Sequence, residues 1–128
     1  MTQPNPPYPL PMPFHATTSN ALDGYDVVET LGLVRGITVR SRSVFGRIGA
    51  VLQQIGGGEI TFLTELCEQT RARAFGIAVE HAKDLGANAL IAVRYDATEI
   101  MSGVSEVLCY GTAVKAVARR APAERLDA

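Results

Sequence analysis

The sequence has no tryptophan and only two cysteines, and neither sign of charge dominates in it. With 12 basic and 13 acidic side chains the formal net charge is −1, which gives no field for nucleic acid or an anionic membrane surface. Two cysteines cannot build a disulfide framework, and no stretch combines the basic and apolar regions of a signal peptide. The apolar runs are strand-sized, whereas a membrane span needs about 20 residues. We therefore expect a cytoplasmic protein with neither a nucleic-acid nor a membrane partner.

Proline, by contrast, is concentrated at the N-terminus, where six of the seven prolines lie within residues 1–13. This composition offers few backbone donors and no apolar periodicity, so residues 1–18 are predicted to be a proline-rich disordered tail. The spacing of the prolines also resembles a ligand for aromatic grooves, and a partner of the tail is the alternative to a solvated extension. Residues 119–128 mix proline, charge and alanine, which predicts a flexible C-terminal tail.

The residues between the tails, 19–118, are enough for one domain with its own core. Residues 25–40 are rich in β-branched and apolar side chains and are broken by Gly32 and Gly36. Glycine inside a strand often marks a bulge or bend. The pattern therefore predicts either two short strands or one bulged strand.

Two helices are predicted next. Residues 41–55 have apolar residues at helical spacing after a candidate N-cap, Ser43, which predicts a short helix that ends at glycines 56–58. A longer helix is predicted to begin at Glu59 or Thr61 and to stop at Gly86. Its charged residues, Arg71 among them, are assigned to a solvated face. Its expected core stripe comprises Leu63, Leu66, Cys67, Thr70, Ala74, Ile77, Ala78, His81 and Leu85.

Two strands are predicted after the long helix, at residues 89–96 and 104–117. The short connection at residues 101–103 favours an antiparallel hairpin over a parallel crossover. The expected fold is therefore a two-layer α+β subunit, with an antiparallel sheet covered by one long and one short helix. Apolar residues on both sides of the strands suggest that neighbouring subunits cover the second face of the sheet.

Several of these segments resemble the YbjQ-like family, which is also called UPF0145 and is described as heavy-metal-binding. The resemblance covers about residues 17–117. It is most specific at the LGANA turn of residues 85–89, at VRYD of residues 93–96 and at YGTAV of residues 110–114. The proline-rich tail lies outside it.

The resemblance implies a subunit similar in fold to dodecin that assembles as a ring, most often a homopentamer. It implies no established biochemical activity, so the protein is expected to be of unknown function. Many members of the family carry a tyrosine where Leu63 stands and an arginine where Ile77 stands. A site built on those two side chains is therefore not carried over to this chain.

The candidate metal ligands are Cys67, His81 and Cys109, and the cofactor in question is a divalent or soft heavy metal ion. The chain has no paired motif such as CxxC. Cys67 and His81 share one predicted helix but lie about 21 Å apart along it at 1.5 Å per residue. Cys109 could meet either one across the helix–sheet interface. The alternative is that all three residues are ordinary structural side chains, unless a ring gathers several copies of one ligand around its axis.

The sequence offers weaker signals for anion binding and for catalysis. Glycines 56–58 could present backbone N–H groups to an anion, but the segment lacks the lysine and hydroxyl residue of a P-loop. No spacing brings a nucleophile, a base and an orienting group together, so we expect no catalysis. The expected function is that of a non-catalytic homo-oligomeric binding or scaffold protein. The alternatives are a metal-binding module and a binder of small ligands or anions in intersubunit clefts.

Overall fold

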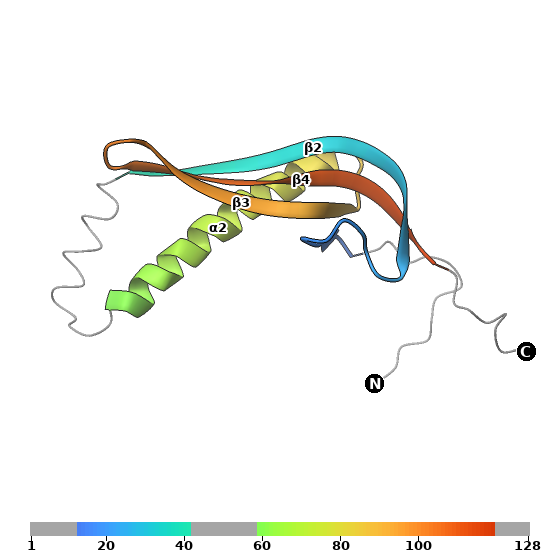
Figure 1. The fold of residues 1–128 in the computed structure, drawn as a ribbon, viewed down its shortest axis with the longest axis horizontal. Helices are drawn as coiled ribbons and strands as arrows, with labels where there is room; N and C mark the ends of the chain where they lie inside the picture. Colours follow the sequence, from blue (N-terminus) through green and yellow to red (C-terminus); the bar gives the residue numbers. More distant parts are fainter. Residues whose placement is uncertain (1–12, 42–58, 120–128) are drawn as a thin grey trace, which may run out of the picture.

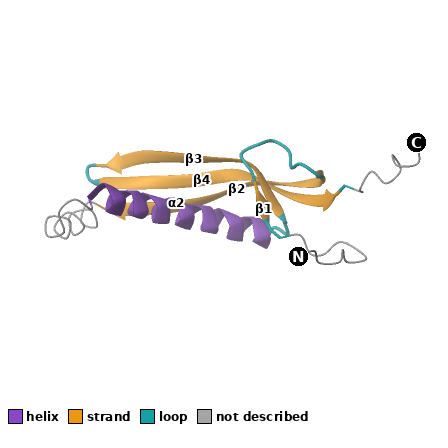
Figure 2. Ribbon diagram, turned by 90° about the horizontal axis from the view of Figure 1, so that it is seen from below, coloured by secondary structure: helices purple, strands orange, loops and turns teal. Residues whose placement is uncertain are grey.

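A computed structural model describes residues 13–41 and 59–119 of the chain (Figure 1). The elements in these residues are β1 (His15–Ala16), β2 (Tyr25–Ser41), α2 (Glu59–Asp84), β3 (Ala89–Met101) and β4 (Val104–Ala118). The strands form one sheet in the order β1-β3-β4-β2, and α2 lies along one of its faces (Figure 2). The predicted two-layer α+β architecture with a long helix is confirmed. Although α2 has 26 residues, it is too polar to qualify as a membrane-crossing helix.

The strand predictions are confirmed where the sequence pattern was strongest. β3 and β4 form the antiparallel hairpin. β2 is one long strand that pairs antiparallel with β4, and its register shifts twice before Leu33, so the bulged-strand alternative holds. The predicted short helix at residues 41–55 and glycines 56–58 lie outside the described residues.

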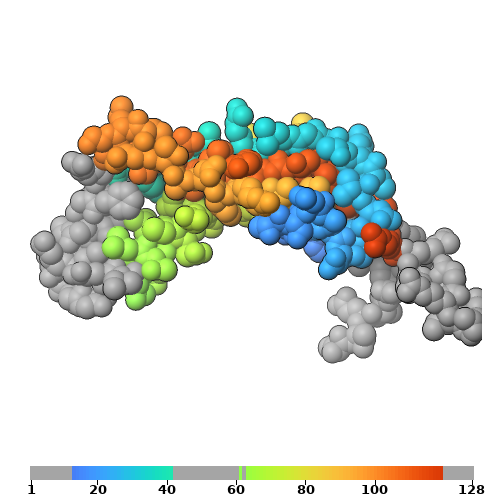
Figure 3. All heavy atoms as spheres, viewed as in Figure 1, coloured from blue at the N-terminus to red at the C-terminus, as the bar shows by residue number. Residues whose placement is uncertain are grey.

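The three long strands form the expected antiparallel sheet, and the two-residue β1, which the sequence did not predict, pairs parallel to β3 and makes the sheet mixed. This strand falls inside residues 1–18, the range assigned above to the tail. The physical reason is that the prolines end at Pro13, so the residues after it regain N–H groups. The N–H of Thr17 donates to the carbonyl of Leu90 at 3.0 Å. The N-terminal segment, blue in Figure 3, thus lies against β3.

A bulge in β3 forms at the end of this contact. The register passes from Ile91 opposite Thr112 to Arg94 opposite Tyr110, so β3 carries one residue more than β4. Ala92 has a φ of 54°, and its N–H donates to the carbonyl of Ser19 at 2.8 Å. Because strand side chains alternate, the extra residue exchanges the two faces of β3 beyond this point.

The helix packs against the sheet through small residues. Gly36 of β2 is buried against the backbone of Ala74 and Ala78, and a Cβ atom there would overlap the carbonyl oxygen of Ala74. The buried stripe of α2 is accordingly Thr70, Ala74, Ala78 and Ala82 at four-residue steps. The predicted stripe was wrong in four of its members, because Leu63, Cys67, His81 and Leu85 are exposed.

The C-terminal end of α2 is closed by a Schellman motif, as the predicted stop at Gly86 requires. Gly86 has a φ of 89° and donates its N–H to the carbonyl of Lys83 at 2.9 Å. The N–H of Ala87 donates to the carbonyl of Ala82, also at 2.9 Å. Asn88 then binds the backbone of Ala116 in β4 through both ends of its side-chain amide, each at 2.8 Å. This pair of bonds fixes the turn against the sheet.

Candidate functional site

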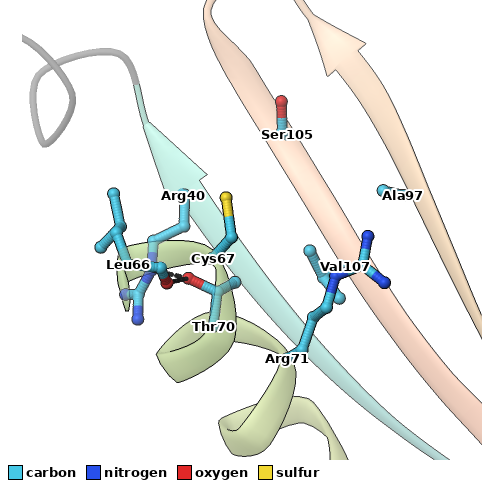
Figure 4. Close-up of a pocket in the computed structure, with 8 residues that line it drawn as sticks. All are labelled: Arg40, Leu66, Cys67, Thr70, Arg71, Ala97, Ser105 and Val107. Carbon is cyan, nitrogen blue, oxygen red and sulfur yellow. Dashed lines mark hydrogen bonds between the residues drawn. The ribbon is translucent and has the colours of Figure 1, made fainter. Parts of the chain in front are cut away.

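A cavity of about 170 Å³ lies between the first half of α2 and the part of the β3–β4 hairpin next to its turn (Figure 4). It exists because α2 is held tightly at Gly36 and diverges from the sheet toward its own N-terminus, as Figure 1 shows. Its walls come from all four of the long elements. The lining residues are Arg40 of β2, Leu66, Cys67, Thr70 and Arg71 of α2, Ala97 of β3, and Ser105 and Val107 of β4.

Two arginines line this cavity, and each is held by a different contact. The Nε of Arg40 donates to the hydroxyl oxygen of Thr70 at 3.2 Å, and that hydroxyl donates to the carbonyl of Leu66 at 2.9 Å. The guanidinium of Arg71 lies over the ring of Tyr95, with 5.7 Å between its Cζ and the ring centroid. Both contacts leave the positive charge in place.

Neither arginine is neutralised by an ion pair in the described residues. The ion pairs there join Lys115 to Glu29 at 3.6 Å and Arg119 to Asp26 at 2.8 Å. Both lie away from the cavity lining. The cavity therefore has mostly apolar walls, and the two arginines on its lining are not ion-paired within the described residues.

Next to the cavity, Tyr95 and Cys109 form a neutral pair. Burial raises the pKa of the Cys109 thiol above its ordinary value of 9.0, and the hydrogen bond with Tyr95 opposes this shift. Burial and the neighbouring Cys109 likewise raise the pKa of the Tyr95 phenol above 10.0. Because both shifts favour the protonated form, Cys109 is a thiol and not a thiolate near neutral pH.

The structure separates the three residues that the sequence singled out as metal ligands. Cys67 is exposed and lines the cavity, whereas His81 is exposed near the other end of α2. Cys109 is fully buried in the core beside Ala74 and Ala78. Within residues 13–41 and 59–119, no three His, Cys, Asp or Glu side chains come together as a metal ion would require. The donor set of one subunit, over those residues, does not fit a metal centre.

His15, the other histidine, lies in β1 with its ring 5.0 Å from that of Tyr25, centroid to centroid. Its Nε2 is buried, and the hydrogen bonds of the described residues leave that atom without a partner. The position of His15 is therefore determined by its place in the sheet. His15 is not one of the residues that line the cavity.

Sequence reasoning missed both arginines of the cavity. Arg71 was assigned to the solvated face of the helix, although it follows Cys67 by four residues and so lies on the same side of α2. Arg40 alternates with Gly36 and Thr38 on the helix-facing side of β2, a relation that only the observed register makes plain. The helical spacing that places Arg71 beside Cys67, taken together with the strand alternation that places Arg40 beside Thr38, could have indicated both arginines.

The opposite face of the sheet carries exposed apolar side chains. Leu33, Ile37 and Val39 of β2 alternate with buried residues that face α2, and they are 67%, 44% and 51% exposed. Leu108 of β4 pairs with Ile37 in register on the same side. We call these four residues the open-face patch.

Comparison with known proteins assigns the family. A sequence model described as "Putative heavy-metal-binding" matches residues 14–117, a range that includes β1. The chain belongs to the YbjQ family. The resemblance drawn from the LGANA, VRYD and YGTAV segments is thereby confirmed.

Curated relatives carry the same family designation. A UPF0145 protein of Solibacter usitatus is 57% identical over 101 residues, which cover 79% of this chain and 90% of the relative. A UPF0145 protein of Burkholderia orbicola is 54% identical over 103 residues, which cover 80% of this chain and 86% of the relative. Both relatives are matched along most of their length.

A solved structure supports the fold. A protein of unknown function from Pediococcus pentosaceus, assigned to the DUF74 family, superposes with a TM-score of 0.50 at 16% identity. The superposition covers 78% of this chain and 94% of that one. At this identity the likeness concerns the fold of the YbjQ family and carries no site residue.

Proposed function

We propose that this protein is a non-catalytic binding or scaffold protein of the cytoplasm that works as a ring of identical subunits. The open-face patch carries this proposal. Scattered apolar residues are normal on a protein surface, but Ile37 and Val39 are successive residues on this face of β2 and Leu108 lies directly beside Ile37 on β4, while Leu33 lies on the same face beyond Arg35. A second copy of the chain is the partner that we expect to cover it.

The edges of the sheet support the same conclusion. β2, a strand of 17 residues, forms one edge of the described sheet. At the other edge, β1 and the residues that follow it cover β3 only as far as Val93. Long edges with free backbone groups invite pairing with another chain. Five copies is the number that the family resemblance implies.

Native mass spectrometry of the untagged protein, purified without added metal or chelator, tests the proposal directly. We expect the mass of a ring. Ile37→Lys places a charge in the open-face patch and should shift the spectrum to monomers. Leu85→Lys is the matched control, because Leu85 is 49% exposed beyond the end of α2. A monomeric unmodified protein, or an Ile37→Lys protein that keeps the ring mass, would contradict the proposal.

Metal binding is the second candidate, because the family model is described by it. The separated donors of one subunit mean that a soft metal ion would need ligands from several copies, and Cys67 is the exposed thiol available for this. The same spectra test it: a metal mass bound to the ring should disappear in a Cys67→Ala, Cys109→Ala protein. An organic mass would instead indicate a ligand store, and a bare ring would favour a scaffold.

A further inference from the structure

Two strand edges of the sheet have no partner strand among the described residues. β2 forms one edge along its length. At the other edge, the N–H groups of Ala92 and Val93 donate to the carbonyls of Ser19 and Thr17, and residues 94–101 then pair with β4 alone. We call residues 94–101 the distal edge of β3. Both edges present backbone N–H and carbonyl groups to which another strand can bind.

The two edges carry opposite charges. The second half of β2 contains Arg35 and Arg40 but no acidic residue, whereas the distal edge beyond Arg94 contains Asp96 and Glu99 but no basic residue. The ion pairs within the described part of the chain involve none of these side chains. Pairing of two β2 strands would bring positive charges together, whereas pairing of β2 with the distal edge of β3 brings opposite charges together.

The charges also match on each face of the sheet. Arg35 and Asp96 lie opposite β4 residues of the face that points away from α2, and both are exposed. Arg40 and Glu99 both lie opposite Ser105, which lines the cavity under α2. Within one subunit β4 separates β2 from β3, so these partners are two strand spacings apart, about 10 Å. Only a neighbouring subunit brings them side by side.

Arg94, the basic residue at the start of the distal edge, is engaged by its own subunit. Its Nη1 donates to the carbonyl of Thr18 at 2.8 Å and to that of Val93 at 2.9 Å. Its charge therefore stays beside the N-terminal segment and leaves the acidic residues of the distal edge open to a partner.

Ring symmetry determines the direction in which the two edges pair. β2 and β3 are both antiparallel to β4, so they run in the same direction within a subunit. A cyclic ring of more than two copies relates neighbouring subunits by a rotation of at most 120°, which cannot reverse a strand. β2 of one subunit therefore meets β3 of the next subunit in parallel.

We infer that β2 of one subunit pairs in parallel with the distal edge of β3 in the next subunit, with Arg35 beside Asp96. In this register Glu99 lies beside Thr38 of the neighbour and diagonal to its Arg40. The inference rests on the proposed ring of identical subunits. It names the two surfaces through which those subunits join.

Charge reversal tests the pairing in the full-length protein. Native mass spectrometry of a dilution series measures the concentration at which half of the ring has dissociated. Arg35→Glu and Asp96→Arg should each raise that concentration by about tenfold or more, because a like-charge contact replaces an attractive one at every interface. The double variant restores opposite charges and should return close to the unmodified value. Arg73→Glu, the same change at an exposed position of α2, should leave the ring unchanged.

A cysteine pair tests the same contact independently of charge. Residues opposite each other on neighbouring strands have Cα atoms about 5 Å apart, within the range of a disulfide. In a Cys67→Ser background, Arg35→Cys combined with Asp96→Cys should give covalent multimers on a non-reducing gel after mild oxidation, because the remaining Cys109 is buried. Either new cysteine alone should give none. Dimers from Arg35→Cys alone would contradict the inference, because they would show β2 paired with β2.

These experiments separate the pairing from the ring itself. A monomeric unmodified protein would overturn the proposed ring and the pairing with it. A ring that withstands Arg35→Glu would overturn the pairing alone. The same holds for a double variant that dissociates as readily as the single variants, and for a ring in which the cysteine pair gives no covalent multimers.

Discussion

Tyr95 of β3 and Cys109 of β4 stand opposite each other in the sheet, and both side chains lie on the side that faces α2. Burial raises the pKa of both groups. Burial therefore favours the protonated form of both side chains in this pair. Its titration gives the protein a dependence on alkaline pH.

The free energy of unfolding should fall as the pH rises past 9.0, the ordinary pKa of a thiol. Above that pH the unfolded chain loses the proton of Cys109 while the folded chain still holds it, so alkali favours the unfolded state until the raised folded pKa is passed. The slope from this thiol is at most about 1.4 kcal/mol per pH unit.

Urea denaturation between pH 7 and 10 measures this dependence. Cys109→Ala should flatten the alkaline decline, whereas Cys67→Ala should leave it as it is, because Cys67 is exposed. The interpretation is wrong if the Cys109→Ala protein declines as steeply as the unmodified one.

Gly36→Ala should destabilise the protein by about 3 kcal/mol or more. The new methyl group would meet backbone atoms of α2, including the nitrogen of Ala78 at 2.7 Å, and backbone cannot move aside as a flexible side chain can. Gly76→Ala is the matched control on α2, since nothing lies within 4 Å of a Cβ atom there. It should stabilise the helix by up to about 1 kcal/mol. Thermal denaturation measures both, and equal effects would contradict the close approach at Gly36.

Asn88→Ala should cost about 2 kcal/mol, because the N–H and carbonyl of Ala116 lose their partners and Ala116 is 2% exposed. Asn88→Asp should also destabilise, since a carboxylate oxygen would then face the carbonyl of Ala116. Asn20→Ala, at an exposed position, should change stability by less than about 0.5 kcal/mol. Chemical denaturation measures the three variants. An Asn88→Ala protein as stable as the control would show that the amide does not secure this turn.

Two buried threonines at the helix–sheet interface should respond to valine with opposite signs. The hydroxyl of Thr38 is buried and has no hydrogen-bond partner in the described part of the chain, so Thr38→Val should stabilise by about 1 kcal/mol. The hydroxyl of Thr70 bonds Arg40 and Leu66, so Thr70→Val should destabilise by a similar amount. Midpoints of urea denaturation measure both. A destabilised Thr38→Val protein would indicate a partner for that hydroxyl.

The sequence was sufficient for the elements with strong local signals. The helix stop at Gly86 and the β3–β4 hairpin depend on neighbours in the chain, and both are confirmed. The side of α2 that packs against the sheet was less predictable. The close approach of Gly36 to the helix favours small residues on that side, and Cys67 and His81 are therefore exposed. Hydrophobicity alone favours large side chains on a core stripe, whereas contact with a glycine favours alanine.

Long-range pairing limited the prediction of the site. β1 is held by backbone hydrogen bonds, and these cannot be predicted from the periodicity of the side chains. The bulge in β3 breaks the alternation that the sequence suggests for Ile91, Val93 and Tyr95, because Ile91 and Tyr95 lie on opposite faces. Arg40 and Arg71 reach one cavity only through the combined placement of β2 and α2.

The extra residue at Ala92 divides β3 into two halves. The face of the sheet toward which a given side chain points is determined separately in each half. Val93 and Tyr95 face the helix, and Arg94 faces away, only because β3 carries one extra residue between Leu90 and Tyr95. Loss or gain of one residue here would invert the distal half of β3 without altering any other amino acid. Chain length at this point, more than side-chain identity, is the parameter to preserve when the protein is redesigned or its relatives are aligned.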